Sequence, residues 1–128
     1  MKCVHLDFHT SPDIENIGCQ FNKAEFTQIL KDAKVDLITV FAKCHHGYSY
    51  YPTKLGTINP GLKFNLLKEE IDAIHDAGAK APIYITMGWS KKDADEHPEW
   101  HQINFWTKKP VIFGYNGGKL DEPLDTPI

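Results

Sequence analysis

The sequence predicts an α/β fold in which strands and helices alternate in the order β-α-β-α-β. Apolar residues recur at strand spacing in three segments and at helical spacing in the two segments between them. Each helix returns to the next strand through one or two residues, whereas the strand-to-helix connections, 10–21 and 44–64, are long. This order is typical of a parallel sheet whose strands are joined by right-handed crossovers.

The first strand is expected at 2–9 and the first helix at 22–34. Apolar and polar residues alternate along 2–9, so its apolar side chains share one face of a strand. Asn22 suits a helix N-cap, and Glu25 stands three residues later, as a capping box requires. Apolar residues then follow at spacings of three and four, which predicts a helix with one apolar stripe.

The second strand is expected at 36–43, the second helix at 65–77 and the third strand at 80–88. The segment 36–43 is β-branched and almost continuously apolar, as a strand buried on both faces should be. The helix at 65–77 carries one apolar stripe and ends at Gly78. Pro82 is tolerated because early strand positions need not donate to the ladder.

The rest of the chain lacks the pattern of a third long helix. A short helix is expected near 93–101, where Pro98 limits it to one or two turns. The segment 108–128 is rich in Pro, Gly, Asp and Lys and is expected to be a loop. We therefore expect 1–128 to form one domain of three strands, two main helices and a long loop after the third strand. A closed eight-stranded α/β barrel needs roughly 250 residues, about twice this length.

Composition restricts the partners of the chain. All of the 14 basic residues are lysines, and with 17 acidic residues the net charge is −3. Because arginine is preferred for bidentate recognition of phosphate and guanine, we expect neither nucleic acid nor an anionic membrane surface as a partner. Mean hydropathy is −0.40, and the short apolar runs predict no membrane span. We expect a cytoplasmic protein, in which Cys3, Cys19 and Cys44 form neither a disulfide framework nor a zinc ribbon.

Polar and aromatic side chains follow the predicted strands at the points where the long connections begin. His9 ends the first strand, His45 and His46 follow the second, and Trp89 follows the third. Parallel α/β folds carry their sites at this carboxyl edge of the sheet. Neighbouring residues of an extended chain point in opposite directions, so the His-His pair shares a face only if the chain turns, which Gly47 permits.

These residue types suit a sugar ligand. Neutral imidazoles both donate and accept hydrogen bonds, as sugar hydroxyls do, and flat aromatic faces stack on sugar rings. Sugar contacts are therefore expected from His9, His45, His46 and Trp89, and from Tyr51, one of several aromatic residues that follow the second and third strands. The same aromatic residues also fit a small apolar core beneath the long loops.

His5, Asp7 and His9 alternate along the first strand and leave three interpretations open. Charged groups on a sheet face are costly unless they are paired. The three side chains fit a zinc or iron site, a sugar site in which His9 contacts hydroxyls, or a paired polar network. The sequence places no pair of carboxylates on two neighbouring strand ends, as glycosidases require. No catalytic residue, cofactor or metal is therefore assigned.

A family resemblance is carried by five short stretches. They are VFAKCHHGY at 40–48, YPTK at 51–54, NPGL at 59–62, HLDFHT at 5–10 and HPEW at 97–100. In these stretches the chain resembles the α-L-fucosidase-like glycoside hydrolases, and most of all their glycosyl-hydrolase relatives of uncharacterised activity. The similarity covers about residues 3–101 and is weak beyond them.

The resemblance implies a (β/α)8 barrel of which this chain supplies the first three strands. In the fucosidases a histidine after the first strand and a His-His pair after the second contact the sugar hydroxyls, and these positions match His9, His45 and His46. Fucosidases typically read Ala-Lys-His-His-Asp-Gly, whereas here Cys44 precedes the His-His pair and no Asp stands before Gly47. The resemblance also implies that the nucleophile lies on the fourth strand and the acid/base later still, outside this chain.

The sequence thus favours an incomplete barrel related to α-L-fucosidase that supplies sugar contacts, lacks the catalytic carboxylates and is inactive alone. One alternative is a metal-dependent barrel hydrolase that uses His5, Asp7 and His9. Another is a non-catalytic carbohydrate-binding module. The expected partners are a carbohydrate and either a chain that supplies the rest of the barrel or further copies of this chain.

Overall fold

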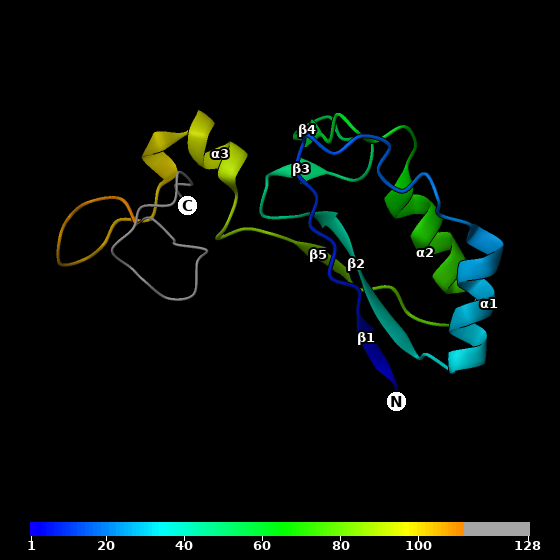
Figure 1. The fold of residues 1–128 in the computed structure, drawn as a ribbon. Helices are drawn as coiled ribbons and strands as arrows, with labels where there is room; N and C mark the ends of the chain where they lie inside the picture. Colours follow the sequence, from blue (N-terminus) through cyan, green and yellow to red (C-terminus); the bar gives the residue numbers. More distant parts are fainter. Residues whose placement is uncertain (112–128) are drawn as a thin grey trace.

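A three-stranded parallel sheet forms the centre of the computed structural model, which describes residues 1–111 (Figure 1). The long strand β2 (Leu37–Lys43) lies in the middle, with β1 (Cys3–His5) on one side and β5 (Ile83–Ile85) on the other. Both neighbours run parallel to β2. The predicted order of three parallel strands with a helix in each connection is therefore confirmed.

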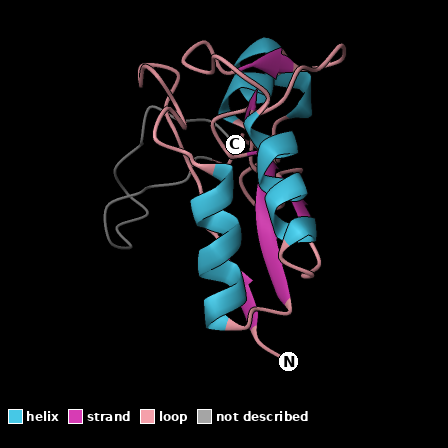
Figure 2. Cartoon of the chain, turned by 90° about the vertical axis from the view of Figure 1, so that its right-hand side faces the viewer, coloured by secondary structure: helices cyan, strands magenta, loops and turns pink. Residues whose placement is uncertain are grey.

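The two connecting helices are α1 (Lys23–Ala33) and α2 (Leu66–Asp76), which pack on each other along one face of the sheet. Figure 2 shows them side by side in front of the strands. The predicted N-cap of α1 is present, since Asn22 Oδ1 accepts the Glu25 amide proton at 3.1 Å. Asn65 caps α2 in the same way. Local capping therefore sets where both helices begin.

A continuous apolar core joins these helices to the sheet. Alternate residues of β2 point toward the helices, as the pleat of a strand requires. Apolar side chains from both helices meet them, and burying such surface is worth about 25 cal/mol per Å². The members of this helix-side core are Leu30, Ile38, Val40, Ala42, Leu67, Ile74 and Ala79.

A second core lies at the carboxyl end of β2, beneath the long connections. It comprises Ile17, Phe41, Cys44, Tyr50 and Leu66. Cys44 and Tyr50 have no exposed surface at all. This second core therefore anchors the connections that carry the histidines to the end of the sheet.

The first strand is shorter than the predicted 2–9. Only Cys3–His5 pair with β2, and one further ladder bond joins the Leu6 amide to the Thr39 carbonyl at 3.1 Å. Further along the chain a backbone amide bonds to a side chain instead of to β2, since the Thr10 amide donates to Tyr50 Oη at 3.1 Å. Pairing with a buried tyrosine replaces pairing with β2, so the regular strand ends early.

The third strand is also shorter than the predicted 80–88, and its pairing with β2 shifts register between Phe41 and Lys43. The connection 44–64 contains two short strands that the sequence did not predict. They are β3 (Tyr48–Ser49), antiparallel to β2, and β4 (Thr57–Ile58), parallel to β3. The complete sheet is therefore mixed.

After β5 the chain forms α3 (Lys91–Glu96) and a single 3₁₀ turn at Pro98–Trp100. These correspond to the short helix predicted near 93–101. Of the loop predicted at 108–128, the part after residue 111 lies outside the described residues. None of the helices within 1–111 has the length and apolar character needed to cross a membrane. All three cysteines are free thiols.

Candidate functional site

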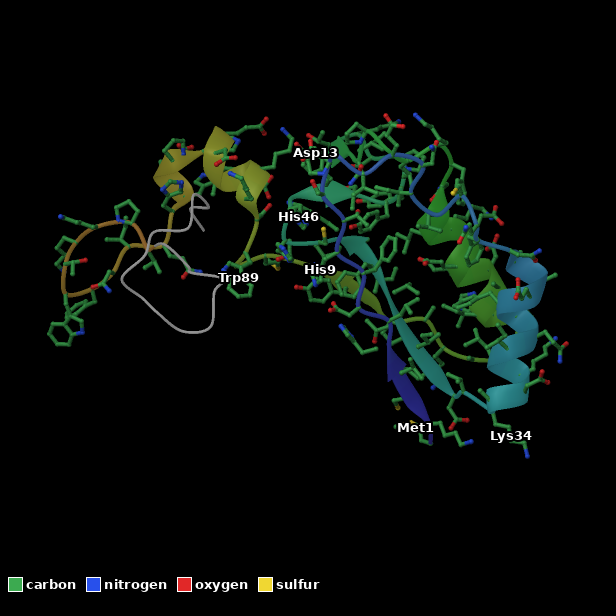
Figure 3. The ribbon with its side chains drawn as sticks, viewed as in Figure 1. Met1, His9, Asp13, Lys34, His46 and Trp89 are labelled. Atoms are coloured by element: carbon green, nitrogen blue, oxygen red, sulfur yellow. The ribbon has the colours of Figure 1, made fainter. Side chains whose placement is uncertain are left out.

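The predicted site residues gather at one end of the sheet. Figure 3 shows His9, His46 and Trp89 near the carboxyl ends of β2 and β5, whereas Met1 and Lys34 lie at the opposite end. Three separate connections supply these side chains, one after each parallel strand. The topology of a parallel sheet thus brings together residues that are up to 80 positions apart in the sequence.

Four of the predicted residues form a row of rings. The ring centroids of His9 and His45 lie 4.3 Å apart, and those of His45 and His46 are stacked at the same separation. Trp89 joins this row at its middle ring, with its centroid 6.4 Å from that of His45. Trp89 is 43% exposed, so aromatic surface is accessible beside the imidazoles. This arrangement combines polar edges with a flat apolar surface.

The tight turn that Gly47 permits is present, and it places His45 and His46 on one side. The Gly47 amide donates to the Cys44 carbonyl at 2.9 Å, and Gly47 has a φ of +91°. A Cβ at this position would lie 2.6 Å from Lys92 Cβ. Both the backbone angle and the close approach of α3 therefore require glycine.

The start of α3 braces this turn. The Lys91 amide donates to the His45 carbonyl at 2.8 Å, and the Lys92 amide donates to the His46 carbonyl at 3.3 Å. Amides in the first turn of a helix have no partner within the helix, so the turn satisfies two of them. The ammonium group of Lys43 pairs with the Asp93 carboxylate and adds a second link between β2 and α3.

The two adjacent histidines are held in their neutral form. Burial lowers the pKa of His45, and the nearby His46 and His9 rings lower it further. Burial, followed by the nearby His9, lowers the pKa of His46. Each ring therefore carries one proton at neutral pH, and offers one donor and one acceptor.

The polar residues predicted on the first strand, of which only His5 lies within β1, are paired with one another. His9 Nε2 lies 2.8 Å from Asp7 Oδ1, and His5 Nε2 lies 4.0 Å from the same oxygen. The edges of both imidazoles also pack against the Phe41 ring. Within residues 1–111, no group of three or more His, Cys, Asp or Glu side chains is placed to hold a metal ion. These contacts match the paired polar network among the three interpretations.

The remaining predicted sugar contact, Tyr51, is not among the residues that the ring contacts described above bring together. Tyr51 is partly buried and packs against the helix-side core, whereas the histidines and Trp89 lie in the ring row. A separate cavity of about 320 Å³ is lined by residues on either side of Trp89 in the sequence, Gly88 and Ser90, and by Lys43, Trp100 and Gln102 among others.

Sequence reasoning missed a buried set of polar residues behind the His-His pair. Tyr50 Oη contacts Thr10 Oγ1 at 2.8 Å and donates to Cys44 Sγ at 3.1 Å. Cys44 Sγ in turn lies 3.5 Å from His46 Nδ1. No local sequence pattern predicts these contacts, because Thr10 and Tyr50 stand 40 positions apart.

Comparison with known proteins supports the predicted resemblance. A model of the family described as "Hypothetical glycosyl hydrolase 6" matches residues 22–114. Among solved structures, the chain is similar to α-L-fucosidase isoenzyme 2 from Paenibacillus thiaminolyticus, with a TM-score of 0.77 and 47% sequence identity. This similarity covers 82% of the present chain and 16% of the fucosidase chain. A search of curated proteins found no match.

The resemblance predicted from the short stretches is thus confirmed, and the mixed sheet with its parallel strands and helices is similar to part of a fucosidase. The chain spans only 16% of the length of that structure. The family model matches well over half of the present chain. The chain therefore belongs to the Hypothetical glycosyl hydrolase 6 family and is related to α-L-fucosidase.

Proposed function

We propose that this chain forms the sugar-contacting edge of a glycoside hydrolase, with His9, His45, His46 and Trp89 as the contacts. The observation that carries the proposal is the row of rings at the carboxyl edge of the parallel sheet. Imidazoles supply directional hydrogen bonds to hydroxyl groups, and the exposed indole supplies a stacking face. Membership of a glycosyl-hydrolase family supports a sugar as the ligand.

L-Fucose is the first sugar to test, because the similar solved structure is described as an α-L-fucosidase. Cys44 precedes the His-His pair and no Asp stands before Gly47, so the hydroxyl pattern that this chain prefers needs its own measurement. A panel of L-fucose, D-galactose and D-glucose distinguishes sugars that differ in hydroxyl orientation.

The chain is proposed to hold the sugar, while the groups that cleave the glycosidic bond come from later strands of a (β/α)8 barrel. The carboxylate of Asp7 contacts the ring row, but it is already paired with His9. Retaining and inverting glycosidases both need two carboxyl groups that flank the scissile bond. We therefore expect these 128 residues to bind a sugar without turning it over.

The experiment is a titration of the purified chain with each sugar, followed by tryptophan fluorescence and calorimetry. His46→Ala should weaken binding about tenfold, the cost of one hydrogen bond in a partly shielded site. Its free energy of unfolding should stay within about 1 kcal/mol of the wild type. His75→Ala, at an exposed position on α2, is the matched control and should leave affinity unchanged.

Other outcomes favour the alternatives. Absence of binding to every sugar contradicts the proposal, and stoichiometric zinc or iron in the purified protein favours a metal-dependent hydrolase that uses His5, Asp7 and His9. Turnover of an aryl α-L-fucoside should appear once the missing strands are supplied. If it does not, the sugar-binding edge is a carbohydrate-binding module.

A further inference from the structure

A buried chain of hydrogen bonds leads from the second long connection to His46. Asn59, Thr10, Tyr50 and Cys44 follow one another along it. All four side chains are buried, and Tyr50 and Cys44 have no exposed surface. Buried polar groups without hydrogen-bond partners are costly, so each donor proton in this series of hydrogen bonds is expected to have an acceptor.

At the Asn59 end of this series of hydrogen bonds, the donor and the acceptor can be assigned. Asn59 Oδ1 accepts the Gly61 backbone amide proton at 3.0 Å, which fixes the orientation of the side-chain amide. Its nitrogen therefore faces Thr10 Oγ1, at 3.4 Å, and can only donate. Thr10 Oγ1 accepts this proton and lies 2.8 Å from Tyr50 Oη; because the single Tyr50 proton goes to Cys44 Sγ, Thr10 is the donor in this contact.

The hydrogen bonds of Tyr50 connect Thr10 to the Cys44 thiol. Tyr50 Oη also accepts the Thr10 backbone amide proton at 3.1 Å. Its own proton points to Cys44 Sγ at 3.1 Å, a shorter distance than the 3.4 Å to the Phe8 carbonyl. Burial, together with the contact to Cys44, raises the pKa of the Tyr50 hydroxyl, so this donor stays protonated.

We infer that Cys44 is a positioning residue that fixes the tautomer of His46. The thiol accepts from Tyr50 and directs its own proton to His46 Nδ1, 3.5 Å away. With Nδ1 acting as an acceptor, the ring carries its proton on Nε2. His46 therefore presents an N–H donor to the site, which selects an oxygen lone pair of the ligand rather than a hydroxyl proton.

This inference rests on the proposed function only for its consequence in sugar binding. The tautomer itself is a property of the free protein. Cys44 stands between Lys43 and the His-His pair, so the proposed device depends on a residue directly beside the pair.

The test is long-range ¹H–¹⁵N NMR of the histidine rings in the full chain at neutral pH. In the wild type, His46 should show a protonated Nε2 and an unprotonated Nδ1. Cys44→Ala removes the thiol, both as the donor to His46 and as the acceptor of the Tyr50 proton, and the ratio of the Nε2–H to the Nδ1–H form should fall about fivefold. Cys44→Ser restores a donor and should restore the ratio, while Cys19→Ala, at an exposed thiol, should change nothing.

Two results would overturn the inference: a protonated Nδ1 in the wild type, or an unchanged ratio in Cys44→Ala. The first needs no variant, so a failure of Cys44→Ala to fold does not prevent the test. L-Fucose affinity should fall about fivefold in Cys44→Ala and recover in Cys44→Ser. If the wild type binds no sugar while the tautomer behaves as expected, the proposed function fails and the positioning role stands.

Discussion

At the scale of single residues, Gly47 shows how one position controls the geometry of the site. Its positive φ closes the turn after β2, and its missing side chain makes room for α3. Two separate constraints therefore act on the same residue. A second glycine with a positive φ, Gly78, has open space around it and separates these constraints experimentally.

We expect Gly47→Ala to lower the free energy of unfolding by about 3 kcal/mol, from backbone strain and from the clash with Lys92. Gly78→Ala carries strain alone and should cost about 1 kcal/mol. Urea denaturation of both variants measures the difference. Equal losses would show that the approach of α3 to the turn does not constrain the chain.

Local chemistry explains which residues of the site could be predicted. Gly47 stands directly after the His-His pair, so the shared face of the two rings followed from neighbouring residues. The buried partners Thr10, Tyr50 and Asn59 could not be found this way. Their hydrogen bonds join positions 40 to 49 residues apart, and only the folded sheet brings these positions together.

At the scale of elements, α2 carries a carboxyl group on its buried face. Glu70 is only 7% exposed, and burial raises its pKa to about 7. Below about pH 4.5 the group is protonated in both the folded and unfolded states. Between pH 4.5 and 7 the unfolded state loses the proton first, so stability falls as the pH rises and levels off above 7.

We expect Glu70→Gln, which stays neutral at every pH, to remove this decline. At pH 8 the variant should be more stable than the wild type by about 3 kcal/mol, and at pH 4 the two should agree. Urea denaturation across this pH range checks the result. Glu69→Gln, at the preceding and less buried position, is the control and should retain the decline. A wild-type stability that does not change with pH would contradict the expectation.

The elements differ in how well their bounds could be predicted. The strand β2 and the helices α1 and α2 lie within one residue of their expected limits, because caps and apolar periodicity are local signals. The outer strands β1 and β5 are shorter than expected, since their length depends on pairing with β2. The strands β3 and β4 have two residues each, too few for any alternating pattern.

At the scale of the whole molecule, the apolar side chains of the sheet are buried to different extents. The helices cover β2, but Ile83 and Ile85 of β5 are 49% and 54% exposed. Strands of parallel sheets are normally buried on both faces. The order of layers and the family could be predicted from the sequence, because both follow from periodicity and motif; the extent of coverage depends on packing across the molecule.

We expect the purified 128-residue chain to self-associate through this exposed strand. In a solution of the purified chain, another copy is the surface that can cover the exposed isoleucines of β5. Ile83→Thr combined with Ile85→Thr should shift the chain toward monomer in sedimentation velocity at micromolar concentration. Ile29→Thr is the control, since Ile29 is 55% exposed on α1, away from the sheet edge. A wild type that is monomeric throughout this concentration range would contradict the expectation.

The bonds from α3 to the carbonyls of His45 and His46 have a mechanical consequence. The histidine turn cannot change its backbone conformation without releasing the Lys91 and Lys92 amides, and α3 cannot move away without freeing the turn. The connections after β2 and β5 are thus coupled and rearrange together. Ordering one connection around a ligand therefore orders the other at little additional entropic cost.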